Sequence, residues 1–187
     1  MKATKVMDEQ LILVDVNDVR VGYASKAECH NNQGMLHRAF SVFIFNSEKQ
    51  LLLQKRSAKK LLWPLHWSNS VCSHPRKGES SEEAAGRRLK EELGISTHLE
   101  YLYKFKYHAL YQDIGAEYEF CSVYFGYYDG RISSNKDEVA AWRHIDWHRV
   151  NAEIEENPDL FTPWFKMEWQ YIYSNCEDGI GMGKYIA

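Results

Sequence analysis

The sequence predicts an α+β fold in which a mixed sheet is flanked by helices. Residues 40–45 and 51–55 flank the polar run 46–49, which is a hairpin signal, and the apolar runs 102–107 and 118–128 are joined by a loop around 113–115. A capped helical segment lies between the two pairs, and a second helical segment follows them. Paired strands with few helices are typical of α+β folds and not of regular parallel winding.

The remaining strands are predicted at the two ends of this pattern. Residues 11–16 form an apolar first strand, and residues 139–147 form a late one. The turn-forming run 31–34 breaks the chain between His30 and His37. We therefore expect these two histidines to lie on different elements and not on one helix face.

The helix that begins near residue 80 has clear signals at both ends. Ser80 and Glu83 form a capping box, and Gly94 is the predicted stop. Apolar residues recur every fourth position along this helix and are predicted to face the core; they are Ala85, Leu89 and Leu93.

A final aromatic-rich helix is predicted to open with Thr162 as its cap and Pro163 in its first turn. The sequence contains no internal repeat, no low-complexity tract and no linker rich in proline or glycine. We therefore expect one domain over residues 1–187, with its core at about residues 10–170.

Composition limits the classes of partner. A net charge of -3 gives no bulk basic field for nucleic acid or anionic lipid. No apolar run approaches the roughly 20 residues that a membrane span needs, and residues 1–10 lack a signal-peptide core. The 4 cysteines are few for 187 residues, so we expect free thiols and a cytoplasmic location.

Several potential metal ligands are spread along the chain. Glu117 and Glu119 alternate on a predicted strand, so their carboxylates point to the same face. His74 precedes Pro75, which favours an extended backbone and places His74 on the same side as Cys72. Imidazoles and carboxylates together make a divalent-cation site; the candidate ligands are His30, His37, His74, Glu117 and Glu119.

The segment 78–95 resembles the Nudix box, a strand-loop-helix that holds magnesium against a diphosphate. The resemblance rests on the ending Arg-x-x-x-Glu-Glu-x-Gly over residues 87–94, with Glu79 upstream. Two positions differ, because Arg88 stands where that family has a glutamate and Ser73 where it has its first glycine. The resemblance implies a Nudix-like fold with an incomplete hydrolase site.

The rest of the chain resembles type I isopentenyl-diphosphate isomerases. The similarity covers residues 10–170 and is carried by separated motifs in the family's order. These are His30 with His37, the run Asn-Ser-Val-Cys-Ser-His-Pro at 69–75, Glu-Tyr-Glu at 117–119, and Thr-Pro-Trp at 162–164. The implied activity is the interconversion of isopentenyl and dimethylallyl diphosphate through a tertiary carbocation, without flavin.

This resemblance implies two metal ions. The five candidate ligands above would bind one divalent ion, and mixed imidazole and carboxylate ligands suit Mn²⁺ or Zn²⁺. Glu92 would bind a Mg²⁺ that touches the diphosphate.

The same resemblance implies roles for catalytic residues. Glu119, hydrogen-bonded to Tyr107, would protonate the alkene, and Cys72 would remove a proton from the opposite face. An unperturbed thiol titrates near 8.5, so Cys72 is expected to work with little tuning. The other cysteines, Cys29, Cys121 and Cys176, are expected to be small buried hydrophobes.

Substrate-binding positions follow from the resemblance as well. Four cations would bind the diphosphate: Lys26, Arg56, Lys60 and Arg88. Trp164 would face the carbocation, with Trp67 as a weaker candidate. The other histidines, and Trp142, Trp147 and Trp169, are expected to be ordinary packing or surface residues.

Two other functions are compatible with these motifs. One is a Nudix pyrophosphohydrolase, which the helix motif favours and which Arg88 and the pair Cys72 and His74 disfavour. The other is a non-catalytic sensor of metal or diphosphate. The sequence leaves open the physiological direction, the native metal, the oligomeric state and the role of the C-terminal tail.

Overall fold

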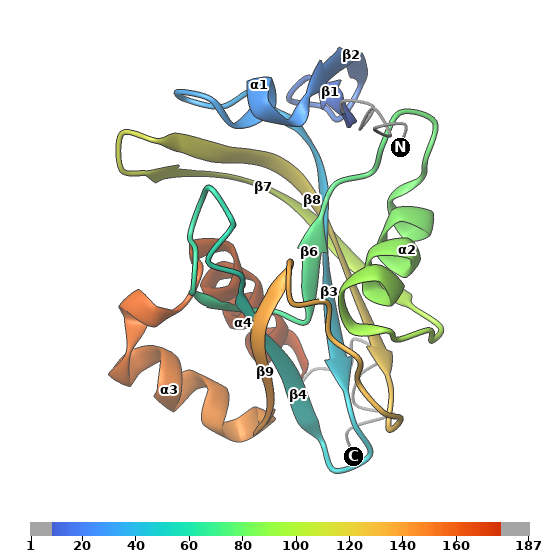
Figure 1. Ribbon diagram of the computed structural model, residues 1–187, viewed down its shortest axis with the longest axis vertical. Coiled ribbons are helices and arrows are strands. Elements are labelled where there is room, and N and C mark those ends of the chain that lie inside the picture. The colour runs from blue at the N-terminus through green and yellow to red at the C-terminus, as the bar shows by residue number, and fades with distance from the viewer. Residues whose placement is uncertain (1–8, 177–187) are drawn as a thin grey trace, which may run out of the picture.

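The computed structural model describes residues 9–176, which form a nine-stranded sheet with helices on both sides (Figure 1). The strands are β1 Gln10–Val14, β2 Arg20–Ser25, β3 His37–Phe45, β4 Gln50–Arg56, β5 Trp67–Ser68, β6 Val71–Ser73, β7 Glu100–Tyr111, β8 Gly115–Tyr127 and β9 Val139–Asp146. The α-helices are α1 Lys26–His30, α2 Ser81–Leu93, α3 Val150–Glu156 and α4 Pro163–Cys176. Short 3-10 turns cover Trp147–Arg149 and Pro158–Leu160.

Strand β3 is the centre of the sheet. It runs parallel to β8 and antiparallel to β1, β4 and β6. Its register places His37 beside Glu119 of β8 and Ser41 beside Cys72 of β6. Because paired residues point to the same face of a sheet, three strands send candidate site residues to one face.

The two faces of β3 supply two separate cores. Phe43 and Phe45 pack with residues of α4, whereas Val42 and Ile44 pack with residues of α2. Figure 1 shows α2 on one side of β3 and β6, and α3 and α4 on the other. Side chains alternate along a strand, so His37 shares the α4 side with Phe43.

Helix α2 has the predicted ends. Ser80 and Glu83 form the capping box, and Gly94 ends the helix with φ of 70°. An N-cap residue such as Ser80 stabilises a helix by about 1 kcal/mol. The predicted core positions Ala85, Leu89 and Leu93 are all fully buried.

The predicted strands are present but mostly longer than expected. β7 extends further, to Tyr111, and β8 begins earlier, at Gly115; these two residues are paired across a tight turn. The elements that were not predicted are β2, the short strands β5 and β6, and the short helices α1 and α3. A signal for α1 exists, since Ser25 and Glu28 form a second capping box.

The final helix begins at Pro163 as predicted. The hydroxyl of Thr162 lies 2.9 Å from the hydroxyl of Ser68, which ties the helix start to β5. Within residues 9–176, no helix has the length and apolarity needed to cross a membrane. The C-terminal tail after residue 176 and the side chain of Cys176 lie outside the described residues.

Candidate active site

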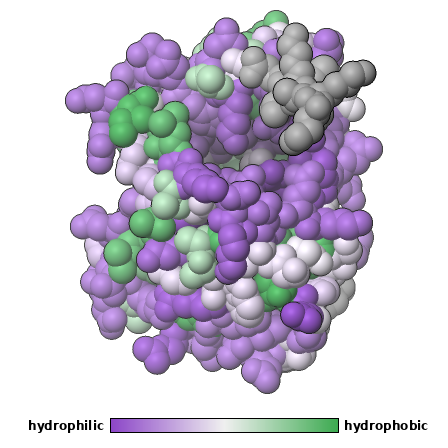
Figure 2. All heavy atoms as spheres, in the orientation of Figure 1, coloured by the Kyte–Doolittle hydropathy of each residue, from purple (hydrophilic) through white to green (hydrophobic). Residues whose placement is uncertain are grey.

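A cavity of about 570 Å³ opens between α1, the sheet face of β6 to β8 and the start of α4. Figure 2 shows a hollow in the upper part of the molecule with a largely hydrophilic rim. A volume of this size fits a small-molecule ligand. The predicted site residues that line it are Lys26, His30, Arg56, Lys60, Cys72, His74, Tyr107, Glu117, Glu119 and Trp164.

The five predicted metal ligands form one buried cluster at the deep end of this cavity. One ligand atom from each lies within 4.8 Å of all the others, the residues being His30, His37, His74, Glu117 and Glu119. They come from α1, β3, the residue after β6, and β8. The prediction that these distant positions converge is confirmed.

Two of the histidines are oriented by the backbone. Nδ1 of His30 donates to the carbonyl of Lys26, and Nδ1 of His37 donates to the carbonyl of Met35, both at 2.6 Å. These bonds leave the Nε2 atoms facing the cluster, where neither has a hydrogen-bond partner. Such an arrangement of the second ring nitrogen is typical of histidines that bind metal.

A carboxylate oxygen of Glu117 joins the two Nε2 atoms among the buried polar atoms without a hydrogen-bond partner. Oε2 of Glu117 lies 2.9 Å from Nε2 of His30 but has no hydrogen-bond partner of acceptable geometry. Buried polar atoms without partners are rare and need an explanation. A divalent cation bound among them would satisfy these atoms, so the cluster fits such an ion.

Burial keeps two of the histidines neutral. Desolvation, followed by the neighbouring His30, lowers the pKa of His37 to about 4. Desolvation also lowers the pKa of His74 well below its usual value. Metal binding requires neutral imidazole, so these two side chains need no deprotonation at neutral pH.

The two glutamates titrate in opposite directions. Desolvation and the charge of Glu117 raise the pKa of Glu119 well above its ordinary value. Although burial opposes it, the charge of His30 lowers the pKa of Glu117 to about 2. Paired carboxyls with separated pKa values mark an acid and an anion. Of the two carboxyls, Glu119 therefore has the greater tendency to hold a proton.

Tyr107 holds this acid from the neighbouring strand. It is paired with Glu119 across β7 and β8, and its hydroxyl donates to Oε2 of Glu119 at 2.5 Å. Desolvation and the charge of Glu119 raise the pKa of Tyr107 well above its ordinary value, so the phenol stays protonated. The predicted contact between Tyr107 and Glu119 is confirmed.

The pKa of the Cys72 thiol is higher than the sequence analysis assumed. Burial raises its pKa to about 12, and the Arg56 guanidinium only partly offsets this effect. Nη1 of Arg56 lies 3.7 Å from Sγ of Cys72. The expectation of a thiol with ordinary acidity is wrong, because desolvation disfavours the thiolate of Cys72.

Arg56 and Trp164 form one wall of the cavity. Arg56 donates to the carbonyls of Leu62 and Trp63 at 2.9 Å and 3.0 Å. Its guanidinium carbon lies 5.1 Å above the Trp164 ring. Trp63, which the sequence did not single out, packs edge-on against Trp164 at 5.3 Å. The Trp164 face therefore already accommodates a cation in this structure.

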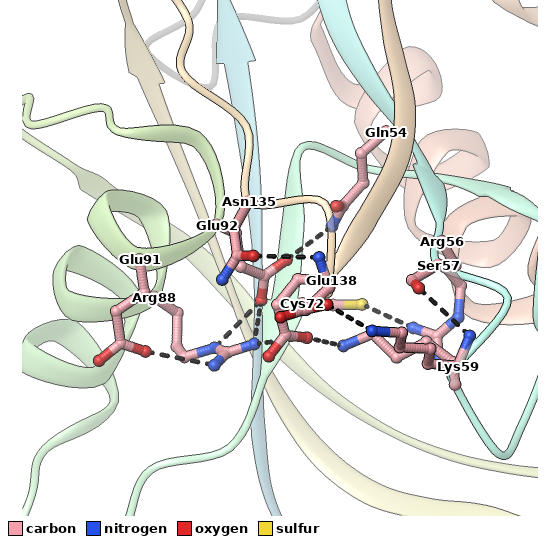
Figure 3. A network of polar contacts seen from close by, with 12 residues as sticks. Gln54, Arg56, Ser57, Lys59, Cys72, Arg88, Glu91, Glu92, Asn135 and Glu138 are labelled. Atoms are coloured by element: carbon pink, nitrogen blue, oxygen red, sulfur yellow. Dashed lines mark hydrogen bonds and ion pairs between the residues drawn. The ribbon is translucent and has the colours of Figure 1, made fainter.

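The predicted diphosphate end contains a network of ion pairs (Figure 3). Arg88 donates to Oε1 of Glu92, and Gln54 donates to the other oxygen of Glu92 at 3.2 Å. Arg88 also lies 3.2 Å from Glu138, which binds Lys60. Glu92 does not belong to the five-residue cluster. Arg88 and Glu92 do not line the cavity directly.

Other predicted residues lie away from the cavity. Trp67, the weaker candidate for the carbocation, instead packs between Lys55 and Arg143. Trp147 and Trp169 are buried and Trp142 is exposed. Cys29 and Cys121 are buried free thiols, as predicted.

Comparison with known proteins agrees with this geometry. The NUDIX domain model matches residues 35–165. Isopentenyl-diphosphate Delta-isomerase 1 of Photorhabdus laumondii is 46% identical over 172 residues, which cover 91% of this chain and 98% of the relative. Isopentenyl-diphosphate Delta-isomerase of Serratia proteamaculans is 45% identical over 159 residues, covering 85% of this chain and 88% of the relative.

The chain belongs to the isopentenyl-diphosphate Delta-isomerase family. Solved structures that share its fold include a Deinococcus radiodurans protein, with a TM-score of 0.65, 24% identity, and coverage of 79% of this chain and 90% of that one. A MutT protein from Methanosarcina mazei has a TM-score of 0.63 at 14% identity, with coverage of 77% and 96%. The isomerase family thus uses the Nudix fold predicted from residues 78–95.

Two features of this isomerase-family site were not predicted from sequence. Glu138, at the entry to β9, binds both Lys60 and Arg88, and no motif marks it. Glu168 on α4 is fully buried and accepts from the thiol of Cys121 at 3.6 Å. Burial raises the pKa of Glu168 to about 8.

Proposed function

We propose that this protein interconverts isopentenyl and dimethylallyl diphosphate by moving protons, as the names of its curated relatives imply for them. One observation carries the proposal. The thiol of Cys72 and the protonated carboxyl of Glu119 line the same cavity from β6 and β8. An alkene bound between them would have an acid and a base within reach.

Glu119 is assigned as the acid for the isopentenyl substrate. Its raised pKa favours the protonated carboxyl, the form that a general acid needs. Donation of this proton to the terminal alkene carbon would leave a carboxylate and a tertiary carbocation. Tyr107 and His74, at 2.5 Å and 2.8 Å from the two oxygens, would fix the carboxyl during this step.

Cys72 is assigned as the base on the other face. As a thiolate it would accept a proton from the carbon next to the diphosphate-bearing carbon, which forms the new double bond. The buried thiol disfavours ionisation, so we assign Arg56 to stabilise the thiolate at 3.7 Å. The roles of Cys72 and Glu119 would exchange in the opposite direction.

The intermediate needs protection from water. Trp164 is 2% exposed and borders the cavity, so its ring offers a dry aromatic face to a cation. An aromatic ring stabilises a desolvated cation by about 2 kcal/mol or more. Trp63 and Tyr107 pack against Trp164 and would hold the ring in place.

Metal binding follows from the buried cluster. His30, His37, His74, Glu117 and Glu119 would hold one divalent ion, and this donor set suits Mn²⁺ or Zn²⁺. A bound divalent ion would add positive charge beside Glu119 and lock its position. Glu92 would hold Mg²⁺ at the diphosphate, which Lys26, Arg56, Lys60 and Arg88 would bind. The proposed reaction is redox-neutral and uses only proton transfers, so we assign no flavin to it.

The test is product identity. The metal-loaded protein is incubated with isopentenyl diphosphate, and separately with a panel of nucleoside diphosphate derivatives. We expect dimethylallyl diphosphate from the first and no release of monophosphate from either. Release of monophosphate or phosphate without an alkene shift would instead identify a Nudix pyrophosphohydrolase. Tight binding of isopentenyl diphosphate without any product would identify a sensor.

A further inference from the structure

One carboxylate, that of Glu138, forms ion pairs with two of the cationic side chains assigned to the diphosphate. Glu138 forms an ion pair with Nζ of Lys60, and its Oε2 lies 3.2 Å from Nη2 of Arg88. Figure 3 shows Glu138 between Arg88 and the 57–60 turn. Glu138 and Lys60 both line the cavity, so this contact lies at the surface that an anionic ligand would meet.

The backbone around Glu138 is fixed from two sides. The amide of Ser57 donates to the carbonyl of Glu138 at 3.0 Å, and the amide of Glu138 donates to the carbonyl of Asn135 at 3.1 Å. The amide of Asn135 donates in turn to the carbonyl of Glu92 at 2.8 Å. Rotation of the Glu138 side chain is therefore the simplest way to release the cations.

The carboxylate is anionic under ordinary conditions. Burial opposes ionisation, but Lys60 and then Arg88 lower the pKa of Glu138 to about 2. Its side chain is 27% exposed, so it is partly in contact with solvent and can be displaced. Arg88 would keep its second partner, Glu92, after Glu138 leaves.

We propose that Glu138 is a built-in competitor for the diphosphate, which holds Lys60 and Arg88 until the anionic ligand replaces it. This inference rests on the proposed function only in taking these two cations as diphosphate ligands. An incoming diphosphate must break both Glu138 contacts before it binds. Glu138 therefore weakens the binding of substrate and product alike, and it favours product release by returning to the cations.

A binding measurement separates this role from a structural one. Inorganic pyrophosphate is titrated calorimetrically into metal-loaded wild-type protein, Glu138→Gln and Asp137→Asn. Asp137 is the matched control because it neighbours Glu138 and carries the same charge, but its partner Lys59 is exposed. Glu138→Gln should lower the pyrophosphate dissociation constant by about tenfold, the scale of a close charge pair. Asp137→Asn should change it by less than about twofold, as for exposed pairs.

Equal effects of the two variants would overturn the proposal, since the gain would then reflect net charge alone. Weaker binding by Glu138→Gln would also overturn it, because Glu138 would then help to hold the ligand. Glu138→Ala should tighten binding in the same direction and serves if the glutamine variant does not fold. The titration needs no turnover, so a protein that binds pyrophosphate but makes no dimethylallyl product would refute the proposed function alone.

Discussion

The two ends of the cavity differ in how their charged and polar groups are paired. At the deep end, Nε2 of His30, Nε2 of His37 and Oε2 of Glu117 face one another without hydrogen-bond partners. At the other end, Lys60 lines the cavity and is already paired with Glu138, which also binds Arg88 outside the lining. The deep end is thus arranged to accept a cation directly, whereas the other end must exchange an internal anion for an external one.

The difference has an energetic basis. Buried polar atoms without partners, like those at the deep end, cost free energy unless a bound ion compensates for their desolvation. Free guanidinium and ammonium groups would suffer the same desolvation at the other end, and Glu92 and Glu138 compensate for it within the chain. Variants at the two ends should therefore fail in different ways.

The largest expected effect is on catalysis at the deep end. Cys72→Ala and Glu119→Gln should each lower kcat by roughly a thousandfold, the scale of general acid–base catalysis. Steady-state conversion of isopentenyl diphosphate measures this loss, and circular dichroism checks the fold. Cys29→Ala removes a buried thiol that packs with Leu11 and Ala24 and does not line the cavity; it is the control and should change kcat by less than about threefold. Near-normal rates for Cys72→Ala or Glu119→Gln would refute their assignment.

The next effect concerns stability at the cation end. Arg88→Ala leaves the carboxylate of Glu92, which is 1% exposed, without its ion-pair partner. Loss of one member of a buried pair costs about 3 kcal/mol, which urea unfolding would detect. Arg87→Ala on the same helix breaks the more exposed pair with Glu79 and should cost about 1 kcal/mol or less. Equal losses would show that burial of Glu92 is unimportant.

A third prediction uses the lowered pKa of His37 in metal-stripped protein. The folded value is about 4 and the unfolded reference is 6.5, so the unfolded state binds more protons between these values. The stabilisation from neutral His37 is present above pH 6.5 and is lost as pH falls toward 4.

Comparison with His37→Gln isolates this contribution from the opposite one of Glu119. The unfolding free energy of the wild type minus that of His37→Gln should rise by roughly 2 to 3 kcal/mol from pH 4 to 6.5. Chemical denaturation at several pH values in the presence of a chelator measures it. A difference that does not depend on pH would contradict the neutral, buried state of His37.

The smallest effect is expected at the surface of the cation end. Lys59 and Asp137 are 72% and 74% exposed at their side chains. Exposed pairs contribute little to stability, so Lys59→Ala should change the unfolding free energy by less than about 0.5 kcal/mol. Thermal melts of Lys59→Ala and Arg88→Ala compare the two losses of stability. A larger loss in Lys59→Ala than in Arg88→Ala would contradict the contrast between the exposed surface and the buried pair.

The same contrast explains what the sequence could predict. Helix α2 was predictable because its signals are local, the caps Ser80 and Gly94 and the apolar repeat between them. The metal cluster joins distant strands, and it was predicted from the resemblance of the motifs to a known family. The proposed acid role of Glu119 depends on its burial, and the structure gives the physical reason for its raised pKa.

Two features were out of reach for physical reasons. Glu138 meets Lys60 and Arg88 because β4 pairs with β9, with Arg56 beside Val139, and nothing near residue 138 encodes this register. The raised pKa of Cys72 arises from packing by several elements, which no local pattern reports. By contrast, α1 could have been predicted from Ser25 and Glu28.

The most direct test of the account is deuterium incorporation. The protein is incubated with isopentenyl diphosphate in deuterated water, with divalent metal and then with a chelator. The account predicts deuterium in a methyl group of dimethylallyl diphosphate with metal, and its loss on chelation. Product that forms without solvent deuterium, or at an unchanged rate under chelation, would contradict a metal-anchored Glu119 that protonates the alkene opposite Cys72.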